Sequence, residues 1–135
     1  MMNNEATMTV LVVEPGKKPY TKQIPASNDM RLEALQHEVH GYIQCIYPFE
    51  DPVAILCDDE GKLKGYPLNR ALRDDAGEIY DILTGTFLDV QLTRDSFCSL
   101  SDEFLKKYEE FFRYPEIFYW ENDTIVALSI RQENM

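Results

Sequence analysis

Two acidic turns of the same pattern divide the middle of this chain. DDEGK spans residues 58–62 and DDAGE spans residues 74–78, and both lie next to β-branched and aromatic residues. An Asp side chain can bond to the backbone at the start of a turn, and Gly takes the positive φ angle that the end of the turn requires. The pattern therefore predicts two hairpin corners of a β-sheet, which the rest of the chain covers.

Short apolar runs supply the strands of the predicted sheet. Residues 8–13 and 18–24 are expected to pair as its first two strands, because the turn residues Pro15 and Gly16 lie between them. Residues 53–57 read VAILC, and an uninterrupted apolar run indicates a strand that is buried on both faces near the sheet centre. Further strands are expected at residues 43–49, 63–66, 79–92 and 124–130.

Two interruptions of this pattern need an interpretation. Gly85 falls inside the run 79–92, where we expect a bulge or a bend within one element rather than a break between two. Residues 67–73 begin with Pro and contain Asn69 and Arg70, so they are expected to form a brief irregular segment between the two sheet corners.

Two segments have the periodicity of amphipathic helices. In the first, apolar residues recur every three or four positions, and Gly41 is expected at its C-cap. The second begins at the N-cap residue Ser101 and stops before Pro115, after which residues 115–120 are expected to add one helical turn. The two apolar stripes consist of Leu32, Leu35, Val39 and Tyr42, and of Phe104, Leu105, Tyr108, Phe111 and Phe112.

These elements predict one α+β domain that spans residues 1–135. Its largely antiparallel sheet has five to seven strands, and its two principal helices pack on one face, because that arrangement needs only short connections. Residues 8–92 make up the sheet-rich part, and residues 93–135 make up an aromatic, helical C-terminal part with the last strand. The 44% apolar content suits one folded core of this size.

The formal charge of −11 narrows the choice of partners. Nucleic acids and anionic membranes attract clustered Lys and Arg, so we expect neither as a partner. No apolar run reaches the ~18 residues of a membrane span. The N-terminus lacks the basic and apolar segments of a signal peptide. The acidic balance permits a basic protein partner, and a homodimer stays open as an alternative.

The middle of the chain resembles an uncharacterised family of small bacterial proteins, domain of unknown function 3846. The resemblance covers roughly residues 8–90 and implies a compact α/β domain, as found in gut Firmicutes and in their mobile elements and phages. It implies no activity. The motifs that carry it are LEALQ at 32–36, GYI at 41–43, DEGKLKG at 59–65, PLNRAL at 67–72 and GEIYDILTGTF at 77–87.

Neither of two polar clusters fits a metal site. A calcium loop needs oxygen ligands at alternating positions and a Glu at its twelfth, and the acidic turns do not continue in that way. Glu33, His37 and His40 share one helical face, but that face lies opposite the apolar stripe and no further Cys or His completes a ligand set. We predict turn chemistry and solvent-exposed side chains, with no metal and no cofactor.

No catalytic constellation is recognisable either. Cys45, Cys57 and Cys98 are an odd number without CxxC spacing, which favours reduced thiols in a cytoplasmic protein. A nucleophilic Cys needs a neighbouring His, and neither His37 nor His40 is placed to serve as that base. No catalytic residue is predicted, and enzymatic activity is not expected.

Asn69 and Arg70 are the candidates for a ligand site. In a fixed loop, Asn could bond to the backbone of a ligand, and Arg could bind a carboxylate or phosphate through its planar fork. In the structural alternative, Asn69 caps a turn and Arg70 pairs with a nearby acid. The structural alternative is favoured, and a small-ligand-binding domain or enzyme built on this pair stays open.

The C-terminal aromatic residues are the candidates for a protein interface. Seven aromatic residues fall between residues 108 and 120, and most of them are expected in the core, because one helical stripe over a sheet accounts for them and leaves only a remnant. Tyr119 and Trp120 are expected at the interface, together with the acidic pair Asp74 and Asp75. The function expected is therefore a non-catalytic accessory or interaction protein. An acidic DNA mimic that blocks a restriction or defence protein is the other alternative.

Overall fold

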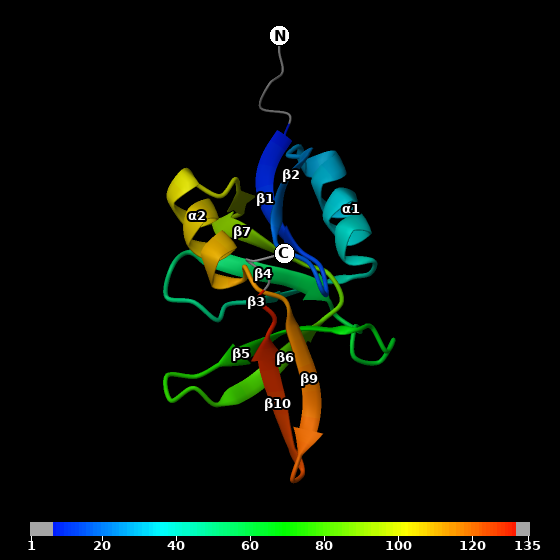
Figure 1. The fold of residues 1–135 in the computed structure, drawn as a ribbon. Helices are drawn as coiled ribbons and strands as arrows, with labels where there is room; N and C mark the ends of the chain where they lie inside the picture. The colour runs from blue at the N-terminus through cyan, green and yellow to red at the C-terminus, as the bar shows by residue number, and fades with distance from the viewer. Residues whose placement is uncertain (1–6, 132–135) are drawn as a thin grey trace.

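The structure, a computed structural model, describes residues 7–131 and contains ten strands and two helices in that range (Figure 1). Neither of these helices is long and apolar enough to cross a bilayer. The elements follow the chain as β1 (Thr7–Val13), β2 (Tyr20–Pro25), α1 (Asn28–Val39), β3 (Ile43–Ile46), β4 (Val53–Asp58), β5 (Leu68–Arg73), β6 (Ile79–Thr84), β7 (Phe87–Leu92), β8 (Phe97–Cys98), α2 (Asp102–Phe111), β9 (Glu116–Glu121) and β10 (Thr124–Ser129).

A six-stranded sheet forms the body of the fold. Its strands run in the order β2-β1-β7-β4-β3, the short β8 pairs with β7, and every pairing is antiparallel. The central strand is β7, in which Asp89 lies opposite Leu11 of β1 and Ile55 of β4. This sheet, with its two helices, confirms the predicted α+β class.

The main sheet is apolar on both faces, and one helix covers each face. Leu11, Ile55 and Phe87 pack with side chains of α2, whereas Leu56 and Leu88 pack with side chains of α1. Figure 1 shows the two helices on opposite sides of the sheet. The expectation that both helices pack on one face is therefore wrong, because strands that are apolar on both faces need cover on both.

The second acidic turn closes a hairpin, as predicted. It joins β5 to β6, which pair with each other apart from the main sheet. The Asp74 Oδ1 atom accepts hydrogen bonds from the backbone N–H groups of Ala76 and Glu78, both at 2.9 Å, and Gly77 takes a φ of 86°. These are the roles that the sequence assigned to Asp and Gly in such a turn.

The first acidic turn does not close a hairpin. Asp58 ends β4, and its buried carboxylate accepts hydrogen bonds from Lys64 Nζ and from Glu60 N–H, both at 2.8 Å. Residues 59–65 then form consecutive turns, and the strand expected at 63–66 is missing. The prediction was wrong because the Asp58 carboxylate holds this segment in turns that fold back on the end of β4.

The helix α1 also departs from its prediction. Of its expected apolar stripe, Leu35 and Val39 are buried, whereas Leu32 and Tyr42 are 57% and 75% exposed. The C-cap is His40, which takes the left-handed conformation with a φ of 66°, and not Gly41. Gly41 meets a different demand, because a Cβ atom there would lie 2.4 Å from the Asp58 carboxylate.

Two segments change their assignment. Residues 79–92 form two strands in different sheets, because Gly85, with a φ of 70°, turns the chain from β6 into β7. The expected single element with a bulge is therefore wrong. Residues 115–120 do not add a helical turn, because Glu116–Glu121 is β9, which pairs in register with β10.

Gly85 gives a stability test of this bend. We expect Gly85→Ala to lower the free energy of unfolding by about 1–3 kcal/mol, since a Cβ atom there would be strained by the positive φ and would lie 2.7 Å from the Tyr66 ring. Gly16→Ala is the matched control, because its φ of 77° is similar but no atom lies within 4 Å. Urea denaturation of both variants separates the two causes, and equal losses would contradict a contact with Tyr66.

Candidate functional site

The β9–β10 hairpin carries an exposed apolar surface. Ile117 lies opposite Leu128, and Tyr119 lies opposite Val126, so these four side chains share one face of the two strands. Ile117, Tyr119 and Leu128 are 48%, 43% and 53% exposed. We call these four residues the outer face of the hairpin.

The other face of the hairpin is fixed to β5. The Glu116 carboxylate accepts a hydrogen bond from the backbone N–H of Ala71 at 2.9 Å and pairs with Arg73 at 3.5 Å. Arg73 also reaches the backbone carbonyl of Ala127 at 3.5 Å. In Figure 1 the hairpin crosses the β5–β6 hairpin. These contacts hold the hairpin in one orientation and leave its outer face uncovered by the described residues.

All charged residues of the hairpin are acidic. Residues 116–129 include Glu116, Glu121 and Asp123 but no Lys, Arg or His. The Glu116 charge is paired with Arg73, whereas Glu121, which is the last residue of β9, and Asp123, which lies in the tip, are exposed. Asn122 and Asp123 form that tip with φ angles of 51° and 65°. An apolar strip with an acidic end is therefore the surface that the hairpin offers.

The predicted interface residues lie at two ends of this hairpin. Tyr119 belongs to the outer face, and Trp120, on the other face near the tip, is 72% exposed. Asp74 and Asp75 lie at the opposite end, where they line a groove of about 510 Å³ with Arg70 and other residues of β5, with residues at the end of α2, and with Glu116 and Ser129 at the hairpin base. The structure therefore brings Tyr119 and Trp120 onto one hairpin but does not place the two Asp residues beside them.

Asn69 and Arg70 lie in a buried strand and not in the loop that was expected. Both belong to β5 and are at most 1% exposed. The Asn69 Nδ2 group donates to the carbonyl of Val13 at 3.0 Å and to that of Gly85 at 2.7 Å, and its Oδ1 accepts from Arg70 at 2.7 Å. These bonds favour the structural interpretation of Asn69.

Arg70 completes the same network. Its guanidinium donates to the carbonyl of Phe112 at 2.8 and 3.2 Å and to that of Lys17 at 2.7 Å. Burial lowers the pKa of Arg70 to about 10, so the group stays charged at neutral pH. Its donors point at backbone carbonyls from two distant segments, and this arrangement favours a structural role for Arg70 as well.

The other polar candidates do not form a recognisable site in the described residues. Glu33, His37 and His40 are exposed on and after α1, and no cluster of three or more His, Cys, Asp or Glu residues in the described range could hold a metal. The three thiols are free. Burial raises the pKa of Cys57 to about 11 and also raises that of Cys45, which disfavours the thiolate that a nucleophile requires.

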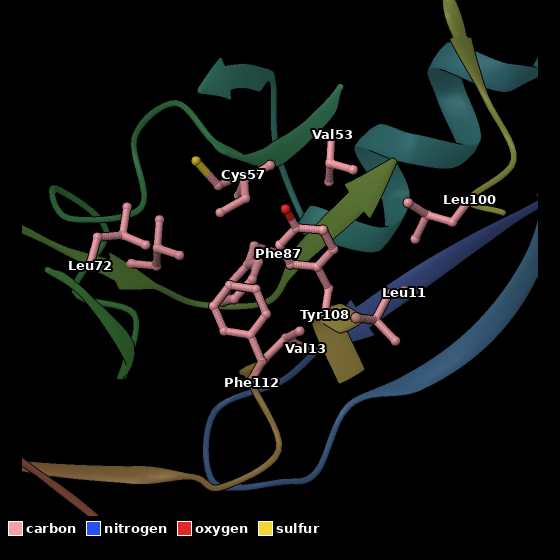
Figure 2. Close-up of a cluster of buried hydrophobic side chains, with 11 residues drawn as sticks. Leu11, Val13, Val53, Cys57, Leu72, Phe87, Leu100, Tyr108 and Phe112 are labelled. Carbon is pink, nitrogen blue, oxygen red and sulfur yellow. The ribbon is translucent and has the colours of Figure 1, made fainter. Parts of the chain in front are cut away.

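Sequence reasoning missed Asp89 in β7, whose carboxyl group is buried. It is 0% exposed, and neither of its oxygens has a hydrogen-bond partner among the described residues. Burial raises the pKa of Asp89 well above its usual value. Asp89 lies on the same face of the sheet as Phe87, which belongs to the buried apolar cluster drawn in Figure 2. The signal was present in FLDVQL, where a single Asp interrupts an apolar strand.

The comparison with known proteins gives a family but no described activity. The model of a domain of unknown function, DUF3846, matches residues 8–113 and so includes the main sheet, both helices and the β5–β6 hairpin. No curated protein and no solved structure matches the chain. The β9–β10 hairpin follows the matched region. Since the match covers most of the sequence, this chain belongs to the DUF3846 family.

Proposed function

We propose that this protein is a non-catalytic interaction protein of the cytoplasm that binds a basic protein partner on the outer face of the β9–β10 hairpin. The observation that carries the proposal is the set of apolar side chains held outward on a hairpin whose other face is fixed to β5. Exposed apolar clusters that include Tyr are common in protein interfaces, where a few such residues supply most of the binding energy.

Charge indicates what kind of partner fits. The hairpin carries only acidic charges, and the whole chain has a net charge of −11. A partner that presents apolar residues bordered by Lys or Arg would complement this surface. A second copy of the chain would bring the same acidic hairpin and the same net charge, so repulsion disfavours a homodimer. The free thiols support a reducing compartment. The family resemblance suggests a bacterial mobile element as the setting.

The alternatives have less support. A DNA mimic needs free carboxylates along one face, but six acidic residues form ion pairs with Lys or Arg, and most of the other acidic residues in the described range are scattered over both helices and several turns. Arg70 lines the groove of about 510 Å³ beside Asp74 and Asp75, but a ligand site would need free donors, whereas those of Asn69 and Arg70 are bonded to backbone carbonyls and to each other.

Site-specific photocrosslinking tests the proposed interface. A photoreactive phenylalanine derivative in place of Tyr119 is expected to crosslink one basic protein in lysate of the bacterium that encodes the chain. The same group in place of Tyr42, which is 75% exposed but far from the hairpin in the sequence, is the matched control and should not capture that protein. The crosslink should weaken as salt is raised, because charge pairs contribute to the contact.

A substitution then measures the contribution of the outer face. We expect Leu128→Lys to weaken binding of the identified partner by about tenfold or more, because it places a charge in an apolar contact. The thermal stability of the Leu128→Lys variant should stay close to that of the wild type, since Leu128 is exposed. The affinity of Trp120→Ala and of a charge-reversed Asp74 and Asp75 variant for the same partner then shows whether the interface includes these residues. Equal capture from positions 119 and 42, a crosslink to a second copy, or unchanged binding by Leu128→Lys would each contradict the proposal.

A further inference from the structure

The core under α2 contains a buried carboxyl that the proposed function does not use. Asp89 is enclosed in the centre of the sheet, and its register neighbours Leu11 and Ile55 are apolar. Neither of its oxygens has a donor among the described residues. An ionised carboxylate in such a place would lack both water and a counter-charge, which is costly. The folded structure therefore favours the protonated form.

The ionisable groups around this core are engaged elsewhere. The hydroxyl of Tyr108, on α2 above the sheet, donates to Asp51 at 2.7 Å, and Lys107 pairs with the same carboxylate. The thiol of Cys57 contacts the carbonyl of Gln44. No Lys, Arg or His occurs in β1, β4 or β7. Besides Tyr108, Lys107, Asp51 and Cys57, the elements that border this core carry Asp58 on β4, Arg70 and Arg73 on β5, Tyr80 and Asp81 on β6, and Asp102, Glu103, Lys106, Glu109 and Glu110 on α2.

We propose that Asp89 makes α2 a proton-controlled cover, which stays on the sheet while the carboxyl is protonated and lifts away when it ionises. The neighbouring strands β1 and β4 are bonded to β7 by backbone ladders, so water reaches Asp89 at greater cost through them. α2 is held on the sheet by side-chain contacts, among them Tyr108 to Asp51, Ser101 N–H to the Gln91 side chain, and Arg70 to the carbonyl of Phe112 at the C-cap of the helix. A helix held in this way can open locally without unfolding the sheet.

The cover, once open, would expose the apolar face of the sheet. Phe87 and Leu11 are 0% exposed beneath α2 and would then meet water (Figure 2). Ionisation of Asp89 supplies the free energy for this change, because the carboxylate gains hydration only in the open state. A rise in pH therefore increases the population of the open state.

Hydrogen exchange of the α2 amides tests the cover. After correction for the pH dependence of intrinsic exchange, the open population in the wild type should rise by up to about tenfold for each pH unit above the ordinary Asp pKa of 3.8, because opening releases one proton. Asp89→Asn cannot ionise, and in this variant the open population should not change with pH. Asp89→Leu serves as a second variant should the Asn side chain disturb folding.

Asp58→Asn is the matched control. Asp58 is also buried, but its ion pair with Lys64 lowers its pKa, so its loss should leave the pH dependence at α2 unchanged. An infrared band of a protonated carboxyl at neutral pH should be present in the wild type and absent from Asp89→Asn. The same pH dependence in Asp89→Asn as in the wild type would overturn the proposal, as would exchange in β7 that increases in parallel with exchange in α2.

Discussion

Arg70→Ala should lower the free energy of unfolding by about 3–5 kcal/mol, the largest loss that we expect from one side chain. The substitution removes all donors to the carbonyls of Lys17 and Phe112 and to the Asn69 side chain. The acceptors on Phe112 and Asn69 are buried, and an unpaired polar group in the interior keeps its full desolvation cost, whereas the bond to the Lys17 carbonyl is partly buried. The turn after β1, the end of α2 and the strand β5 would lose their common contact.

Chemical denaturation measures this loss of stability, and two further variants show which property of Arg70 causes it. Arg70→Lys keeps the charge but not the planar fork, so most of the loss should remain. Arg73→Ala removes a partly exposed Arg that lies three positions further along β5 and pairs with Glu116, and it should cost less than about 1 kcal/mol. A loss from Arg70→Ala no larger than that from Arg73→Ala would contradict the structural role of Arg70.

Asp89→Leu should have the opposite effect and raise the free energy of unfolding at neutral pH by roughly 2 kcal/mol. The apolar side chain replaces a carboxyl that the folded structure leaves without a partner. Because burial raises the pKa of Asp89, the folded state keeps a proton that the unfolded chain releases above pH 3.8. The wild type therefore loses stability as the pH rises above 3.8, and this cost is absent at lower pH.

Denaturation curves at several pH values test this dependence. The advantage of Asp89→Leu over the wild type should be largest at neutral pH and should shrink as the pH falls toward 3.8. Asp58→Asn should instead lower the free energy of unfolding, and this loss should be largest at neutral pH. Burial acts to raise the pKa of Asp58, but Lys64 and the N–H of Glu60 lower it, so the Asp58 carboxylate stabilises the fold above the ordinary pKa. A gain from Asp89→Leu that does not vary with pH would exclude ionisation as its cause.

Local signals in the sequence were enough for several elements. The apolar run VAILC became β4, in which every residue is buried. Ser101 caps α2 by accepting a hydrogen bond from the N–H of Phe104 at 3.3 Å, as a Ser before an amphipathic segment predicts. The family resemblance was confirmed, and the match extends beyond the expected limit to Arg113.

Residues with distant partners were misplaced. Asn69 and Arg70 were expected in a loop because two adjacent polar residues are unusual in a buried strand. Besides the carbonyl of Gly85, their backbone acceptors belong to Val13, Lys17 and Phe112, which are 42 or more positions away, and no local pattern contains that information. The placement of the helices failed for a similar reason, because the order of the strands decides which faces need cover.

The hairpin was misread although its signal was local. Residues 116–121 read EIFYWE, a β-branched and aromatic run typical of strands, but their position after a helix and Pro115 suggested a further helical turn. Tyr119 and Trp120, which the sequence suggested as interface residues, are 43% and 72% exposed, and their role in an interface stays a prediction. What the sequence did not indicate is the register with β10, which brings Ile117 and Leu128 beside Tyr119 and Val126.

The position of the β9–β10 hairpin has a consequence for how such proteins diversify. The chain returns to the hairpin base where the N–H of Ile130 bonds to the carbonyl of Pro115 at 2.7 Å, and the family match ends two residues before that Pro. The hairpin is thus an appendage, attached to the scaffold at one end and through Glu116. Under the proposed function, exchange of some fifteen residues would redirect the protein to a new target, while the scaffold could be inherited unchanged.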